Sequence, residues 1–123
     1  ENKFFRPFSF FEAFVIDIVI FQKANNSGCD SYIRIHADGI NNSSISGVSV
    51  LTASSKNRYL SPAVQKASEK LSKDILTEYL KTTGAKNRGI SYRDDLTGTN
   101  WSKIPTTLIE LGFMSNPAED KKM

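Results

Sequence analysis

The chain has 123 residues, of which 39% are hydrophobic and 24% charged, a composition typical of one globular domain and not of a disordered chain. Its net charge of +3 and its sequence pI of about 9.0 favour polyanionic surroundings, but the basic residues do not form the stripe typical of dedicated nucleic-acid binders. The single cysteine, Cys29, excludes an intrachain disulfide, and one His with one Cys excludes a self-contained zinc finger.

Residues 1–22 differ from the rest of the chain, because they hold seven of its eight Phe residues. A basic start followed by an apolar run is typical of a secretory signal, but Glu12 and Asp17 interrupt the run and no small-residue cleavage site follows. The run is also too short and too charged to predict a transmembrane segment. Two interpretations stay open: translation from a shifted reading frame or a damaged gene start, or a hydrophobic N-terminal helix that packs on the sheet.

Two strands are predicted from residue 31 onward. In SYIRIHADG the apolar residues alternate, which predicts a strand with Ile33 and Ile35 on a buried face and His36 at its end. The segment 37–39 forms the exit turn. A polar loop follows, and GVSVLT predicts a second strand of the same character.

The clearest helix begins at Ser61 and Pro62, which are typical of an N-cap and of the first helical position. Gly84 is well placed for the C-terminal cap. Apolar residues recur at spacings of three or four and predict the buried face, namely Val64, Ala67, Leu71, Ile75, Leu76, Tyr79 and Leu80. One long helix packed on a sheet is therefore expected.

The last part of the chain predicts a polar connection over 85–103, a strand over 106–113 and a helix start at Asn116. The connection is long enough to form part of a binding surface. Asn116 and Pro117 are a cap and a first helical residue, and Glu119 stands at the capping-box position. The chain reaches Met123 before that helix completes two turns, which suggests a domain that has been shortened.

Glu110 is the unusual residue of the last strand, because a carboxylate inside TTLIELGF is costly if it is buried without a partner. Each of His36 and Glu110 lies near the C-terminal end of a predicted strand, the edge where open α/β sheets bind ligands. Hydrogen-bonded structural roles would explain either residue alone. Together they are also consistent with a zinc-binding imidazole beside a carboxylate that deprotonates a zinc-bound water.

Two blocks, ANNSGCDSYIRIHADG and IPTTLIELGFMSNPAED, resemble the zinc-dependent N-acetylmuramoyl-L-alanine amidases of the amidase type 3 family. The first block is similar to the family's "AN…AD…SIHAN" strand and the second to its "LVELGFLSNPxD" strand. The resemblance covers roughly residues 23–123, as a partial catalytic domain, and leaves residues 1–22 outside the family pattern as an atypical apolar segment.

The resemblance implies an α/β fold of three layers, in which helices flank a twisted, mostly parallel sheet that is incomplete here. It also implies a peptidoglycan hydrolase that cuts the amide between the lactyl group of muramic acid and L-Ala of the stem peptide. His36 matches a zinc ligand, and Glu110 matches the catalytic glutamate that activates the zinc-bound water. The expected cofactor is Zn²⁺, the partner is peptidoglycan or its muropeptides, and the location is the bacterial cell wall or the extracellular space.

The chain departs from the family where two further zinc ligands are expected, a His in a "GHGG"-type loop and a Glu at the next helix start. It has no second His and no such loop, and Glu12 precedes the strand-like run and so does not match. Turnover would then need ligands from another segment or chain. The alternatives are a non-catalytic remnant that binds muropeptide through 85–103 and the His36 edge, and a small nucleic-acid binder, which rests on pI alone and is not expected.

Overall fold

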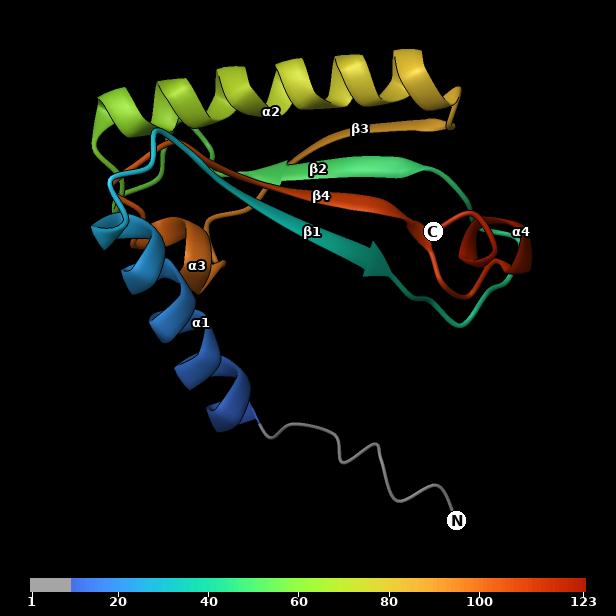
Figure 1. Ribbon diagram of the computed structural model, residues 1–123, viewed down its shortest axis with the longest axis horizontal. Helices are drawn as coiled ribbons and strands as arrows, with labels where there is room; N and C mark the ends of the chain where they lie inside the picture. The colour runs from blue at the N-terminus through green and yellow to red at the C-terminus, as the bar shows by residue number, and fades with distance from the viewer. Residues whose placement is uncertain (1–9) are drawn as a thin grey trace.

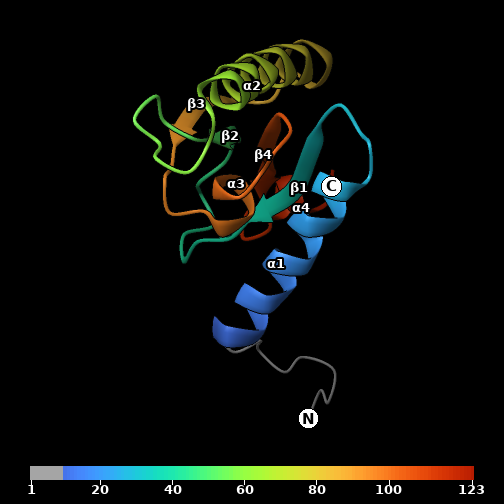
Figure 2. The same ribbon diagram turned by 90° about the vertical axis from the view of Figure 1, so that its left-hand side faces the viewer.

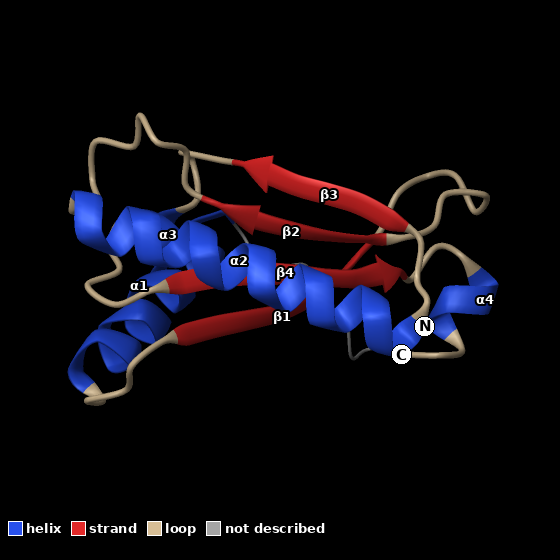
Figure 3. Cartoon of the chain, turned by 90° about the horizontal axis from the view of Figure 1, so that it is seen from above, coloured by secondary structure: helices blue, strands red, loops and turns tan. Residues whose placement is uncertain are grey.

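The computed structural model describes the backbone of residues 10–123 and the side chains from residue 18 onward. Four strands form one sheet in the order β1-β4-β2-β3 (Figure 1). The bounds are β1 Tyr32–Asp38, β2 Val48–Thr52, β3 Asn87–Tyr92 and β4 Thr106–Phe113. The pairs β1–β4 and β2–β3 are parallel and the central pair β2–β4 is antiparallel, so the sheet is mostly parallel, as predicted (Figure 3).

Helix α2, Pro62–Thr83, covers one face of the sheet and has the predicted ends. The side chain of Ser61 accepts a hydrogen bond from the Val64 N–H, and Gly84 adopts the left-handed conformation at φ 65°. The core forms between this helix and the two central strands, from Val48, Val50, Leu76 and Ile109. Helix α3, Thr97–Asn100, lies on the opposite side of the sheet, which gives the expected three layers (Figure 2).

Two buried serines on α2 were not part of the predicted apolar face, although both face the sheet. The Ser68 Oγ accepts a hydrogen bond of 2.9 Å from the Thr106 N–H, at the first residue of β4. The Ser72 Oγ lies 2.7 Å from the Thr107 Oγ1 and from the Ser68 carbonyl oxygen. Since small hydroxyls allow close approach and satisfy polar groups, they fix the start of β4 against the helix.

The prediction that residues 85–103 form one long polar loop was wrong. That segment contains β3 and α3, joined by a short link. β3 is an edge strand with mostly exposed side chains, and within it only Gly89 and Ile90 are partly buried. Because an edge strand of this kind lacks regular apolar alternation, the sequence pattern does not reveal it.

The prediction that Ile33 and Ile35 are buried was also wrong, since they are 44% and 67% exposed. β1 is an edge strand, and α2 packs mainly over β4, β2 and β3. Among the described residues, no element covers this face of β1 as α2 covers its neighbours. The alternation was detected correctly, but the covering layer was not predictable from it.

Helix α1, Phe10–Asn26, contains most of the atypical N-terminal segment and projects from the body of the molecule (Figure 2). Its principal partner is α3 and not the sheet, and Phe21 is the buried residue of its described side chains. Residues 1–9 of the segment lie outside the described residues. The proposed domain boundary at residues 22 and 23 falls inside this helix and stays a prediction.

The short helix α4, Pro117–Asp120, begins as predicted, because the Asn116 side chain accepts from the Ala118 and Glu119 N–H groups. The predicted capping box does not form. Glu119 instead accepts hydrogen bonds of 2.8 Å from the Gly47 N–H and the Phe113 N–H, one with each carboxylate oxygen. Glu119, which was predicted to cap its own helix, therefore links the start of β2 to the end of β4.

Candidate active site

His36 and Glu110 are direct neighbours in the sheet. They are register partners across the parallel β1–β4 pair, and the His36 Nδ1 lies 3.9 Å from the Glu110 Oε1. Ser49 on β2 pairs with Glu110 from the other side. The expectation that two strands carry these residues to one region of the sheet is confirmed, although His36 lies two residues and Glu110 three residues before the end of its strand.

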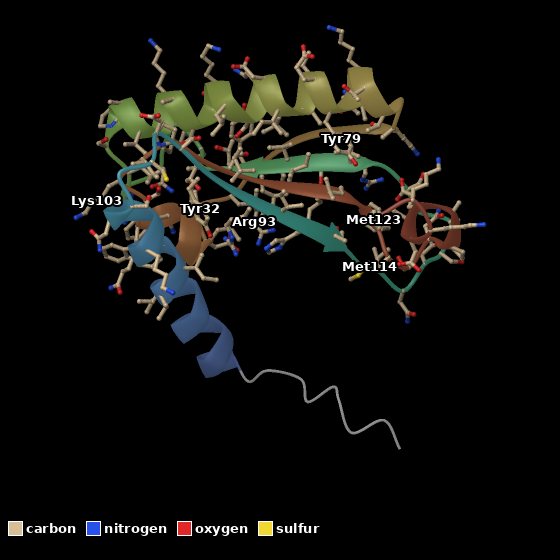
Figure 4. All side chains as sticks on the ribbon, viewed as in Figure 1. Tyr32, Tyr79, Arg93, Lys103, Met114 and Met123 are labelled. Carbon is tan, nitrogen blue, oxygen red and sulfur yellow. The ribbon has the colours of Figure 1, made fainter. Side chains whose placement is uncertain are left out.

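The pair faces the side of the sheet opposite α2. Thr107 and Ile109 of β4 pack against α2. Because side chains alternate along a strand, Glu110 lies on the opposite face. Arg34 shares the face of His36 and lies against α3, where a Cβ at Gly98 would approach the Arg34 Nη1 to 2.8 Å. Figure 4 shows Tyr32, also on this face, on the side of the sheet away from α2.

The local backbone is irregular immediately beyond the pair. The β1–β4 register shifts between His36 and Asp38, so that Asp38 pairs with Phe113. The Asp38 carbonyl oxygen then accepts a hydrogen bond of 2.8 Å from the Met114 N–H. Bulges of this kind occur often beside active sites, because they redirect side chains at the end of regular pairing.

Glu110 is a poorly solvated carboxylate. Its side chain is 15% exposed, whereas that of His36 is 45% exposed. Burial raises the pKa of Glu110 above its usual value, the negative charge of Asp38 adds to this, and Arg34 partly opposes it. The Glu110 Oε2 is buried and has no hydrogen-bond partner among the described residues. A carboxylate of this kind binds a proton more readily than a solvated one and is suited to general-base chemistry near neutral pH.

A polar network that the sequence did not reveal fixes the connection between β3 and α3. Asp94 accepts hydrogen bonds from the Ser54 N–H and Oγ and from the Asn57 Nδ2. The same Asn57 amide donates to the Asn100 Oδ1 at 2.8 Å, and the Asn100 Nδ2 donates to the Asp94 carbonyl oxygen. The bonds from Ser54 and Asn57 lower the pKa of Asp94, with the Ser54 hydroxyl as the largest cause.

The side chains described by the structure do not by themselves fit a catalytic zinc ion. No group of three or more His, Cys, Asp or Glu residues in the described part of the chain is placed to share a metal. Catalytic zinc sites normally have three protein ligands. His36 and Glu110 therefore provide one imidazole and one carboxylate of such a site, and not a complete ligand set.

A cavity of about 590 Å³ lies elsewhere, between the end of α2 and α4. Tyr79, Leu111, Glu119 and Lys122 are among the residues that line it, and neither His36 nor Glu110 does so. The candidate site therefore lies on the face of the sheet opposite α2 and not in this cavity.

Known proteins are similar to this chain in sequence and in fold. A family model described as N-acetylmuramoyl-L-alanine amidase matches residues 18–123. The "Probable cell wall amidase LytH" of Staphylococcus epidermidis is 32% identical over 91 residues, which are 74% of this chain and 27% of that protein.

Solved structures of amidases have the same fold. The N-acetylmuramoyl-L-alanine amidase of Clostridium difficile 630 matches with a TM-score of 0.71 and 23% identity, over 89% of this chain and 53% of that chain. The Ami1 amidase of Mycobacterium smegmatis matches with a TM-score of 0.67 and 26% identity, over 82% of this chain and 47% of that chain. This chain thus spans about a quarter of the curated relative and about half of each solved structure.

Proposed function

We propose, from the premise that this chain belongs to the N-acetylmuramoyl-L-alanine amidase family, that it acts in peptidoglycan hydrolysis. The bond cut is the amide between the lactyl group of muramic acid and L-Ala of the stem peptide. The observation that carries this assignment is the register pairing of His36 with Glu110 on the exposed side of the sheet.

Glu110 is the general base of the reaction. Its carboxylate takes a proton from the attacking water as that water adds to the amide carbonyl carbon. The tetrahedral intermediate then collapses, the C–N bond breaks, and Glu110 returns the proton to the leaving amine of L-Ala. Partial burial of Glu110 supports this role, because it brings the pKa of the carboxyl closer to the working pH.

His36 is a zinc ligand in the complete site, as the family resemblance implies. Its partly exposed imidazole is accessible from solvent, and the other ligands must come from residues outside the described part of the chain or from a second polypeptide. The isolated chain is accordingly expected to hold zinc weakly.

A second candidate function, muropeptide binding without turnover, is favoured by that incomplete ligand set. The same surface would then recognise the substrate and leave its amide intact. Either function places the protein at the bacterial cell wall, outside the cytoplasmic membrane. None of the helices within residues 10–123 combines the length and apolarity that a bilayer-spanning segment requires.

Purified peptidoglycan sacculi separate the two functions. Release of new L-Ala amino termini is measured after incubation with the wild-type chain and zinc, and bound protein is measured by co-sedimentation. An amidase releases amino termini, and Glu110→Gln abolishes the release while binding persists. Binding without release by the wild-type chain would establish the second function, and neither binding nor release would contradict both.

A further inference from the structure

Two large aromatic side chains lie exposed beside each other at the α3 end of the molecule. Tyr59 is 60% exposed and Trp101 is 57% exposed, and their ring centroids lie 5.9 Å apart with the planes tilted by 42°. They come from segments far apart in the sequence, the loop after β2 and the residue that ends α3. Two adjacent exposed aromatic rings form an apolar surface that a ligand can cover.

The backbone beneath the two rings is held in place by hydrogen bonds. The Asn57 Oδ1 accepts from the Tyr59 N–H at 2.9 Å, and the Asn57 Nδ2 donates to Asn100, the residue before Trp101. On the other side, the Asn25 Nδ2 donates to the Trp101 carbonyl oxygen at 2.9 Å. Because the ring-bearing segments are already ordered, little conformational entropy would be lost when a ligand binds there.

The aromatic pair belongs to the same side of the sheet as Glu110. α3, which Trp101 terminates, packs against Arg34, and Arg34 shares the face of His36. Figure 4 shows Lys103, two residues after Trp101, at the end of the molecule where α1 and α3 meet. From Thr106 at the start of β4 to Glu110 the strand advances about 13 Å. A polymer lying on this face would therefore run along the strand from the α3 end toward Glu110.

We propose that Tyr59 and Trp101 form a saccharide-stacking subsite for the glycan strand of peptidoglycan, which rests on the amidase or muropeptide-binding function proposed above. Sugar rings carry apolar C–H faces that pack on aromatic faces, while their hydroxyl groups stay hydrated or bond to the polar tips of Tyr and Trp. The subsite holds the sugars and leaves the stem peptide to the region of His36 and Glu110.

Geometry favours a sugar over a nucleic acid, although nucleobases also stack on aromatic rings. Charges of both signs lie nearby, since Arg58 precedes Tyr59 and Asp95 is paired with Arg93 at 2.7 Å. Charge therefore does not select between the two ligands. The two rings contact each other, so no base can insert between them.

Trp101 is the only tryptophan in the chain, so its fluorescence reports directly on this subsite. The full chain is titrated with the peptidoglycan disaccharide lacking any peptide, with a free stem peptide, and with single-stranded oligothymidylate. We expect a saturable blue shift of Trp101 emission with the disaccharide alone. Tyr59→Ala should weaken disaccharide binding about tenfold, whereas Tyr92→Ala, which removes another exposed tyrosine, should leave it unchanged.

An unchanged emission up to millimolar disaccharide, or equal weakening by Tyr92→Ala, would overturn the proposal, and a response to oligothymidylate alone would assign the pair to nucleic acid instead. Far-UV circular dichroism verifies that Tyr59→Ala is folded. The disaccharide contains no amide to the stem peptide, so its binding is measured independently of hydrolysis. Failure of this titration is therefore distinguishable from failure of the hydrolysis assay.

Discussion

His36 and Glu110 occupy the same register position on adjacent parallel strands, with the His36 Nδ1 3.9 Å from the Glu110 Oε1. The distance exceeds that of a hydrogen bond, so at this separation the imidazole acts on the carboxylate through its charge when it is protonated. The Glu110 Oε2 likewise has no partner among the described residues. The pair is thus arranged in a way that costs stability, which is common where residues serve chemistry.

The first prediction concerns the stability cost of Glu110. Because its folded-state pKa is raised, the stability contribution is most favourable at low pH and falls as pH rises from the unfolded value through the folded one. The free energy of unfolding of Glu110→Gln, measured in urea at pH 7, should therefore equal that of the wild type or exceed it by up to about 1 kcal/mol. Near pH 3 the gain should vanish. Glu78→Gln on the exposed side of α2 is the matched control, and a clear loss at Glu110 would indicate a structural carboxylate instead.

A second prediction concerns Ser68. Its removal as Ser68→Ala leaves the buried Thr106 N–H without its hydrogen bond, so the free energy of unfolding should fall by about 1–3 kcal/mol. The control is the exposed Thr77, whose hydroxyl donates a hydrogen bond to a carbonyl oxygen of its own helix. Thr77→Ala should change the free energy of unfolding by less than about 0.5 kcal/mol. Equal effects of the two changes in urea denaturation would show that the helix–sheet bond contributes nothing specific.

A third prediction concerns Asp94 and the loss of stability at acid pH. Its lowered pKa means that it stabilises the fold above its unfolded pKa, and that this contribution is lost as pH falls through the lower folded value. Asp94→Asn should cost about 1 kcal/mol at pH 7, and the difference from the wild type should shrink as the pH falls below about 4. Asp74→Asn, in a surface pair with Lys70, should cost less. A pH-independent loss at Asp94 would contradict the charge-based explanation.

Glu119 gives a fourth prediction. Glu119→Ala leaves the Gly47 and Phe113 N–H groups without acceptors and should lower the free energy of unfolding by about 2–4 kcal/mol. Asp120→Ala, at the next position of the same helix and exposed, should have a much smaller effect on thermal unfolding. Similar melting temperatures for the two variants would show that Glu119 does not hold the strand ends together.

The sequence predicted those parts of the fold in which periodicity and capping agree. α2 has its expected ends at Ser61 and Gly84, and the strands that carry His36 and Glu110 were found because apolar residues surround the polar ones. The neighbourhood of His36 and Glu110 followed from their equivalent places on two strands. Local patterns were sufficient there because each of them reflects burial of a single face.

Features that depend on tertiary partners were not predictable. β3 is an exposed edge strand without alternation, and Ile33 and Ile35 are exposed because no described element covers β1. The bonds of Glu119 join residues 72 and 6 positions away, which a local capping rule cannot anticipate. The aromatic pair of Tyr59 and Trp101 joins residues 42 positions apart, and nothing in either segment alone indicates it.

The most direct test of the central claim is mass spectrometry of a defined disaccharide-peptide after incubation with the chain and zinc. Wild-type protein should yield two products, the disaccharide with a free lactyl carboxylate and the stem peptide with a free L-Ala amine. Glu110→Gln should yield neither, while Glu78→Gln cleaves as the wild type does. Intact substrate after incubation with the wild type, or cleavage by Glu110→Gln at the wild-type rate, would contradict the claim that Glu110 is the base of a peptidoglycan amidase.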